Sequence, residues 1–255
     1  MTTAIRLCHV INLPRRPDRR ADFLRLNAGK GEFIFTDGIE GDSLSRAALE
    51  ADGFLAPGSQ GITQGALGCA MAHKGLWEQC VEDGEPMVIF EDDACLVPNF
   101  AERAAAALAA AAARDITYFG YNLDQSLAVY LAEGVVAAMK IADQAVTGAG
   151  WLDTYASRPD FAPATTALLR PAVVWGLLAY AITPAGALRM LSQAFPLRNH
   201  ELSLLQGPSM SRGIDGSVLA LIQQGAITAA CCFPPLVIGP NNDSDTEGGV
   251  RKRGP

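Results

Sequence analysis

Three consecutive carboxylates, Glu91, Asp92 and Asp93, offer the clearest chemistry in this sequence. They follow the apolar run at 86–90, which is typical of a buried strand. Acids at such a strand end are unfavourable unless a cation lies beside them, and Mg²⁺ and Mn²⁺ prefer carboxylate oxygens. These ions also keep positions for water and substrate phosphates. The cluster therefore predicts a site for a metal ion and a diphosphate, with a solvated turn as the alternative.

The backbone after residue 90 decides which of these carboxylates share an ion. Side chains alternate along an extended strand, so Glu91 and Asp93 lie on one face if the strand continues. We expect Asp93 to be the main metal ligand. Its partner is Glu91 on that face, or Asp92 if the chain turns there. Asp92 is also a candidate contact of the bound nucleotide.

A basic segment follows the first predicted strand, at 5–12. We select Asn12, Leu13 and Arg16 as candidate nucleotide contacts, because arginine pairs well with phosphate. A solvated helix start is the alternative for the arginines. In a parallel sheet the ends of neighbouring strands meet at one edge, so this loop and the acidic cluster are expected to line one site. The arginines are Arg15, Arg16, Arg19 and Arg20.

Strand and helix patterns alternate along the chain and predict an α/β fold, with a mostly parallel central sheet flanked by helices. We expect residues 1–240 to form one domain and residues 241–255 a loop or tail, with everything after Pro234 irregular. The region 123–166 lacks periodicity and predicts loops and short strands. Further strands are expected at 32–35, 86–90, 115–121, 173–183 and 226–233, and helices from 17, at 43–50, 63–82, 99–113, 184–195 and 214–224.

Composition excludes several classes of protein. The chain has 255 residues and a formal charge of −7, which argues against a protein that coats nucleic acid. Its six cysteines show no CxxC spacing and predict a reduced, cytoplasmic setting. The N-terminus lacks the pattern of a signal peptide. The apolar stretch 171–188 is broken by glycine and proline, which argues against a membrane span.

Four blocks, in this order, resemble glycosyltransferase family 25, the group of lipooligosaccharide and procollagen galactosyltransferases. In this family's block that ends at His73 the preceding residue is usually serine, but here it is Ala72. The blocks span nearly the whole chain and are more specific together than singly. They are 10–20 (VINLPRRPDRR), 63–73 (TQGALGCAMAH), 87–93 (MVIFEDD) and 176–187 (GLLAYAITPAGA), followed by Ile214–Asp215 and 234–237 (PPLV).

The resemblance implies a GT-A-type, Rossmann-like fold. It also implies inverting transfer of a sugar, often galactose, from a nucleotide diphosphate donor such as a UDP-sugar, with Mn²⁺ or Mg²⁺. The acceptor would be a saccharide or glycolipid, as in lipooligosaccharide synthesis at the cell envelope. The basic end at 251–253 is a candidate for weak contact with anionic lipids at the inner face of the membrane, with a disordered solubilising tail as the preferred alternative. The family match also favours a donor-site role for His73, whereas a lone histidine on an apolar helical stripe is otherwise a core residue.

Inverting displacement requires a base near the acceptor hydroxyl. Asp215 has the best position, at the start of a predicted helix, and a helix N-cap is its alternative role. Two other functions remain open. One is a non-catalytic partner protein that binds nucleotide-sugar or glycan, and the other is a metal-dependent nucleotidyltransferase or phosphohydrolase. Substitute candidates for the base are His200, Glu201, Asp124 and Asp153.

Overall fold

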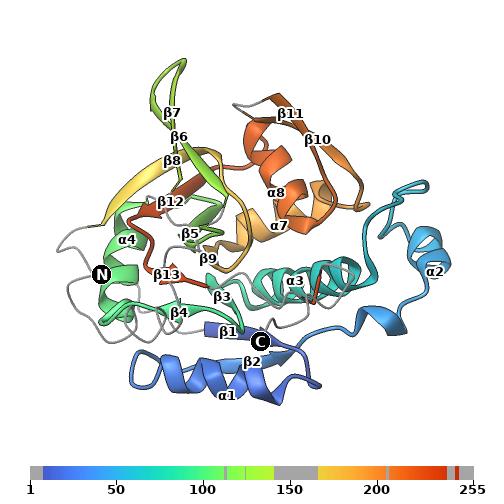
Figure 1. The fold of residues 1–255 in the computed structure, drawn as a ribbon, viewed down its shortest axis with the longest axis horizontal. Coiled ribbons are helices and arrows are strands. Elements are labelled where there is room, and N and C mark those ends of the chain that lie inside the picture. The colour runs from blue at the N-terminus through green and yellow to red at the C-terminus, as the bar shows by residue number, and fades with distance from the viewer. Residues whose placement is uncertain are drawn as a thin grey trace, which may run out of the picture.

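The computed structural model describes residues 8–111, 114–123, 125–140, 166–204, 207–239 and 245–246 (Figure 1). Its helices are α1 (Pro17–Leu26), the 3₁₀ helix η1 (Gly41–Ser43), α2 (Arg46–Ala51), α3 (Gln64–Asp83), α4 (Phe100–Ala110), α7 (Pro184–Gln193) and α8 (Ile214–Gln223). Its strands are β1 (Cys8–Asn12), β2 (Ile34–Asp37), β3 (Met87–Glu91), β4 (Cys95–Leu96), β5 (Ile116–Gly120), β6 (Ser126–Ala132), β7 (Val135–Lys140), β8 (Ala167–Val173), β9 (Ala179–Ile182), β10 (His200–Leu204), β11 (Gly207–Ser211), β12 (Ala229–Phe233) and β13 (Val237–Ile238).

One large sheet forms the centre of the molecule. Along its main path the strand order is β2-β1-β3-β9-β5-β12-β8-β6-β7, and β4 and β13 pair at its margin. β1 runs parallel to β2 and β3, and β5 runs parallel to β12. β9 lies antiparallel between β3 and β5. The α/β fold with a helix-flanked central sheet is confirmed, and the sheet mixes parallel and antiparallel pairs.

Aromatic side chains fill both faces of this sheet. On one face Phe90 packs against Phe23 of α1 and Phe100 of α4, with ring centroids 6.4 and 5.6 Å apart. On the other face Trp77 of α3 and Tyr180 of β9 are both fully buried. Alternation along the strands sends neighbouring residues to opposite faces, so each strand contributes to both layers. Packing of this kind on both faces fixes the positions of β1 and β3 next to the edge strand β2.

The helix α3 is held at its N-terminus by local and by tertiary contacts. The Thr63 hydroxyl accepts a hydrogen bond from Ala66 N–H (3.1 Å), a cap that contributes about 1 kcal/mol. A Cβ atom at Gly68 would lie 2.2 Å from the carbonyl oxygen of Ile39, and one at Gly65 would lie 2.0 Å from that of Asp245. Glycine at these two positions therefore lets other backbone segments approach the helix closely.

Several predicted elements need correction. The single strand expected at 173–183 is interrupted by Gly176, which adopts a positive φ of 81°, so β8 and β9 are separate strands. The segment after Pro234 is not all irregular, because β13 joins the sheet. The hairpin β10–β11 was not predicted. In the region 123–166 the strands β6 and β7 form a hairpin, and residues 141–165 lie outside the described residues.

Two expectations about the chain as a whole can be compared with the structure. All six cysteines are free, and four of them are buried. In the ranges that the structure describes, every helix is too short or too polar to cross a membrane. The basic residues at 251–253 lie outside the described residues.

Candidate functional site

A cavity of about 570 Å³ opens at the edge of the sheet where the parallel strands β1 and β3 end. Its walls come from the β1–α1 loop, the first half of α3, the turn after β3, and residues 175–177, 210–215 and 245–246. The ends of neighbouring strands leave such a crevice in α/β sheets, and ligands commonly bind there. The structure thus brings the basic loop and the acidic cluster to one place.

Asp92 and Asp93 converge on a single guanidinium group. The strand β3 ends at Glu91, and the chain then turns, with Ala94 N–H donating to the Glu91 carbonyl (3.1 Å). Arg19 Nη2 consequently reaches both Asp92 Oδ1 (2.6 Å) and Asp93 Oδ2 (3.3 Å). Asn12 Nδ2 donates to the second oxygen of Asp92 (2.7 Å). The acids that share a partner are therefore Asp92 and Asp93, because the strand does not continue past Glu91.

Asp93 retains one oxygen that is available to a ligand. Its Oδ1 is buried and has no hydrogen-bond partner within the described part of the chain. Burial raises the pKa of Asp93 to about 7, although Arg19 acts in the opposite direction. Burial likewise raises the pKa of Asp92. A buried carboxylate oxygen without a partner, beside two further carboxyl groups, fits the oxygen donors that Mg²⁺ or Mn²⁺ requires.

Glu91 faces a different set of side chains. Its Oε1 lies 3.8 Å from Nε2 of His73, which is fully buried on α3. The other ring nitrogen of His73, Nδ1, is hydrogen-bonded to the Tyr180 hydroxyl (2.8 Å), and Trp77 Nε1–H donates to the same hydroxyl (2.8 Å). Cys69 Sγ belongs to the same group, since ligand atoms of Cys69, His73 and Glu91 all lie within 4.8 Å of one another. The histidine is thus oriented by a buried network and points toward the cavity wall.

Asp215 lies in the first turn of α8 and lines the cavity. The N-cap of this helix is Gly213, so the alternative role of Asp215 as an N-cap is wrong. Its Oδ1 accepts a hydrogen bond from Gly216 N–H (2.8 Å). Burial, and then the nearby charge of Glu91, raise the pKa of Asp215. A carboxylate held in this environment binds a proton more readily than an exposed one.

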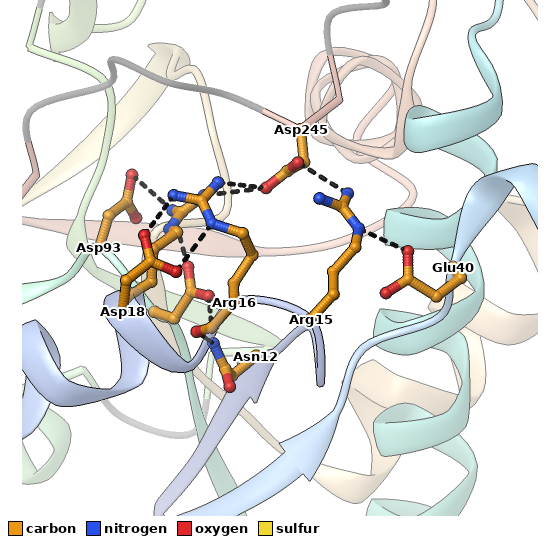
Figure 2. A network of polar contacts seen from close by, with 9 residues as sticks. Asn12, Arg15, Arg16, Asp18, Glu40, Asp93 and Asp245 are labelled. Atoms are coloured by element: carbon orange, nitrogen blue, oxygen red, sulfur yellow. Dashed lines mark hydrogen bonds and ion pairs between the residues drawn. The ribbon is translucent and has the colours of Figure 1, made fainter. Parts of the chain in front are cut away.

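A basic cluster adjoins the acidic one, because Arg19 contacts both Asp93 and Asp245. Asp245 places its carboxylate between Arg15 and Arg16, as Figure 2 shows. Asp245 Oδ1 lies 2.7 Å from Arg15 Nη2, and its Oδ2 lies 3.0 Å from Arg16 Nη1 and 3.5 Å from Arg19 Nη1. The next residue, Thr246, accepts a hydrogen bond at its carbonyl from the Thr63 hydroxyl. The structure therefore contains a site that three cationic side chains form around one anion.

Comparison with known proteins assigns a family to this chain. Residues 6–202 match the model of glycosyltransferase family 25, described as an LPS biosynthesis protein. The chain belongs to glycosyltransferase family 25. The first and third of the blocks that predicted this membership, 10–20 and 87–93, supply Arg15, Arg19 and the acidic cluster of the cavity.

Some relatives of this family 25 protein are named as glycosyltransferases and others as inactive family members. The chain is 34% identical over 113 residues to a procollagen lysyl hydroxylase and glycosyltransferase of Acanthamoeba polyphaga mimivirus, covering 37% of this chain and 13% of that protein. It is 36% identical over 103 residues to a probable inactive glycosyltransferase 25 family member 3 of Rattus norvegicus, covering 37% and 18%. A glycosyltransferase 25 family member of Aedes aegypti is 33% identical over 125 residues, covering 44% and 20%. The matched segments thus span a fifth or less of these relatives.

Most of the predicted site residues of this family 25 protein line the cavity, and two lie behind it. Asn12 is buried and supports Asp92, whereas Arg16 is the N-cap residue of α1 and reaches Asp245. His200 and Glu201 belong to β10, away from the cavity lining, and Asp124 and Asp153 lie outside the described residues. The predicted residues that line the cavity are Leu13, His73, Glu91, Asp92, Asp93 and Asp215.

The sequence reasoning missed two features of this site. Cys69 was not selected as a site residue, although its position one helical turn before His73 places both on one face of α3. Asp245 was assigned to a tail, and no local pattern marks it as a partner of Arg15 and Arg16. Ala72, in the place of the family serine, lines the cavity.

Proposed function

We propose that this family 25 protein is a metal-dependent, inverting glycosyltransferase. The donor would be a UDP-sugar, with galactose as the transferred sugar, and the acceptor a saccharide or glycolipid of the cell envelope. The six free cysteines support a cytoplasmic site of reaction, since thiols stay reduced there. The basic end at 251–253 remains a candidate for weak contact with the membrane.

The observation that carries this proposal is the presence of opposite charges within one cavity. Asp92 and Asp93 form an acidic part of the cavity lining. Arg15 forms a basic part of the lining with Arg16 behind it, and both arginines already bind the Asp245 carboxylate. A complex of a nucleoside diphosphate with a divalent cation binds to two kinds of protein group. Cationic side chains bind its phosphates, and carboxylates bind its metal ion. The cavity volume of about 570 Å³ lies within the range of small-molecule sites.

Each side chain then has a definable role. Asp93, with Glu91 or Asp92, would hold Mn²⁺ or Mg²⁺, which when bound stabilises charge on the departing diphosphate. Arg15 and Arg16 would bind the phosphates after Asp245 leaves. Asp215 would take the proton of the acceptor hydroxyl, because its raised pKa makes it a stronger base than an exposed aspartate. Asn12 would keep Asp92 in place through its hydrogen bond.

A second function has one observation in its favour. Relatives from Rattus norvegicus and Mus musculus carry the word inactive in their names, at 36% identity over 103 residues. In that case the cavity would bind nucleotide-sugar or glycan without transfer, and the protein would act as a partner subunit.

Calorimetric titration of UDP into metal-stripped protein, with and without Mn²⁺, tests the proposal. We expect binding that requires Mn²⁺ in the wild type and is lost in Asp93→Asn. Asp22→Asn is the matched control, because Asp22 is an exposed acid on α1 that pairs with Arg25. Absence of UDP binding in every condition would refute the UDP-sugar donor.

A transfer assay with UDP-galactose then separates the remaining functions. Release of UDP together with a glycosylated acceptor supports the transferase. Binding without turnover supports the non-catalytic function. Formation of UMP would show cleavage within the diphosphate, as expected of a phosphohydrolase or nucleotidyltransferase.

A further inference from the structure

We propose that Cys69, His73 and Glu91 form a second cation site, one that binds a thiophilic divalent ion such as Zn²⁺. This site lies at the inner wall of the cavity and does not include Asp93. The proposal does not depend on glycosyl transfer, since it concerns only the donor atoms of these three side chains.

The geometry of the three residues is the first observation. Cys69 and His73 are four residues apart on α3, so they lie on one face of the helix in successive turns. Glu91 ends the adjacent strand β3 and reaches the same point from the sheet. One donor atom from each residue lies within 4.8 Å of the other two. A small inward movement of these side chains would bring the three donor atoms around one ion.

The state of His73 is a second and independent observation. Its side chain is fully buried, and its Nε2 has no hydrogen-bond partner within the described residues. This atom points toward Glu91 Oε1 at 3.8 Å, which is too far for a hydrogen bond. A buried ring nitrogen without a partner is unfavourable unless a ligand satisfies it. A cation bound by both His73 Nε2 and Glu91 Oε1 would satisfy the histidine nitrogen and replace the missing hydrogen bond.

The hydrogen bonds behind His73 match those of known metal ligands. A histidine that binds metal through one nitrogen usually has its other nitrogen fixed by a hydrogen bond. Here Nδ1 is bonded to the Tyr180 hydroxyl at 2.8 Å, and Trp77 Nε1–H donates to the same oxygen. In the metal-bound form Nδ1–H would donate to Tyr180, whose oxygen has two lone pairs and can accept both bonds. The ring orientation is therefore set before an ion arrives.

The types of donor atom define which ion the site would select. Thiolate and imidazole ligands favour Zn²⁺, whereas Mg²⁺ and Mn²⁺ favour oxygen ligands. The Cys69 thiolate and the Glu91 carboxylate would together neutralise the charge of the dication. Glu91 is 35% exposed and borders the cavity, which leaves a fourth position for water or a substrate oxygen. Three protein ligands and one open position are typical of a catalytic zinc site and not of a closed structural one.

Binding of Co²⁺ to the chelator-treated chain of 255 residues tests this site without an activity assay. Co²⁺ occupies zinc sites and, unlike Zn²⁺, absorbs light. A thiolate bound to Co²⁺ gives a charge-transfer absorption band. We expect one equivalent of Co²⁺ to produce this band and Zn²⁺ to abolish it by displacement. In Cys69→Ser the band should disappear, and Zn²⁺ affinity should fall more than tenfold, the lower limit for loss of a supporting group around a metal.

Cys80→Ser is the matched control, because Cys80 is a buried free cysteine on the same helix. It should keep both the band and the affinity. His73→Gln disturbs the buried network, so Glu91→Gln serves as the second variant, and circular dichroism checks that each variant is folded. The proposal is overturned if the band persists in Cys69→Ser, if Glu91→Gln binds Zn²⁺ as the wild type does, or if folded wild-type protein binds no Zn²⁺.

Discussion

Replacement of Tyr180 by phenylalanine tests whether the buried network behind the cavity stabilises the fold. The Tyr180 hydroxyl accepts a hydrogen bond from Trp77 Nε1–H and bonds His73 Nδ1, each at 2.8 Å. All three side chains are fully buried. The substitution removes one oxygen, keeps the ring, and leaves two buried polar atoms without their partner.

The expected loss follows from these two atoms. A buried donor or acceptor left unsatisfied costs about 1–3 kcal/mol, so two of them should lower the free energy of unfolding by about 2–6 kcal/mol. That is a large share of the 5–15 kcal/mol by which whole domains are stable. Urea unfolding, followed by circular dichroism and by tryptophan fluorescence, measures the change. The slope of the transition should stay constant, since the surface exposed on unfolding does not change.

Tyr121→Phe provides the comparison for this prediction. Tyr121 donates to the carbonyl of Cys232 (3.0 Å), and a carbonyl with a second lone pair tolerates loss of a partner better than a buried N–H does. We therefore expect a smaller loss than in Tyr180→Phe. If Tyr180→Phe costs less than about 1 kcal/mol, or no more than Tyr121→Phe, the buried network does not stabilise the fold.

Three further predictions concern the cavity. Asp245→Asn weakens the pairing with Arg15 and should tighten UDP binding in calorimetry, whereas unchanged or weaker binding would show that Asp245 does not compete with the ligand. Asp93 has a folded-state pKa of about 7 against its ordinary 3.8, so the folded state holds the proton more tightly and wild-type stability should fall as the pH rises from about 4 to 7. This fall should be smaller in Asp93→Asn, as urea unfolding at each pH will show. Gly68→Ala would place a Cβ 2.2 Å from the Ile39 carbonyl and should lower the melting temperature by several degrees, while Gly75→Ala on the exposed side of α3 should not.

Local signals predicted those elements whose ends are fixed by neighbouring residues. The helices expected at 63–82 and 184–195 are present, and Thr63 and Thr183 cap them by accepting hydrogen bonds from the N–H groups of Ala66 and Gly186. The break at Gly176 was not predicted, because it depends on distant packing. A Cβ there would lie 2.3 Å from the side-chain oxygen of Asn122, on another segment of the chain. Contacts between distant segments leave no periodic pattern in the sequence.

The candidate site also combines features that local sequence predicts with features that depend on contacts between distant segments. The acidic cluster after β3 was evident from the sequence, because buried strands rarely end in three acids without a cause. The direction of each carboxylate was not evident, since it depends on the turn between Glu91 and Ala94. The contact of Asp245 with Arg15 joins residues 230 positions apart, and no local rule could have indicated it.

Arg19 links the two sides of the cavity and constrains how ligands can enter. Its guanidinium contacts Asp92 and Asp93 through Nη2 and Asp245 through Nη1. A cation that binds Asp93 alone would meet this positive charge, and a phosphate that binds the arginines alone would meet the carboxylates. A metal–nucleotide complex satisfies both sides at once, because each of its charges faces an opposite one. The cation and the nucleotide should therefore strengthen each other's binding, and by linkage the two effects must be equal.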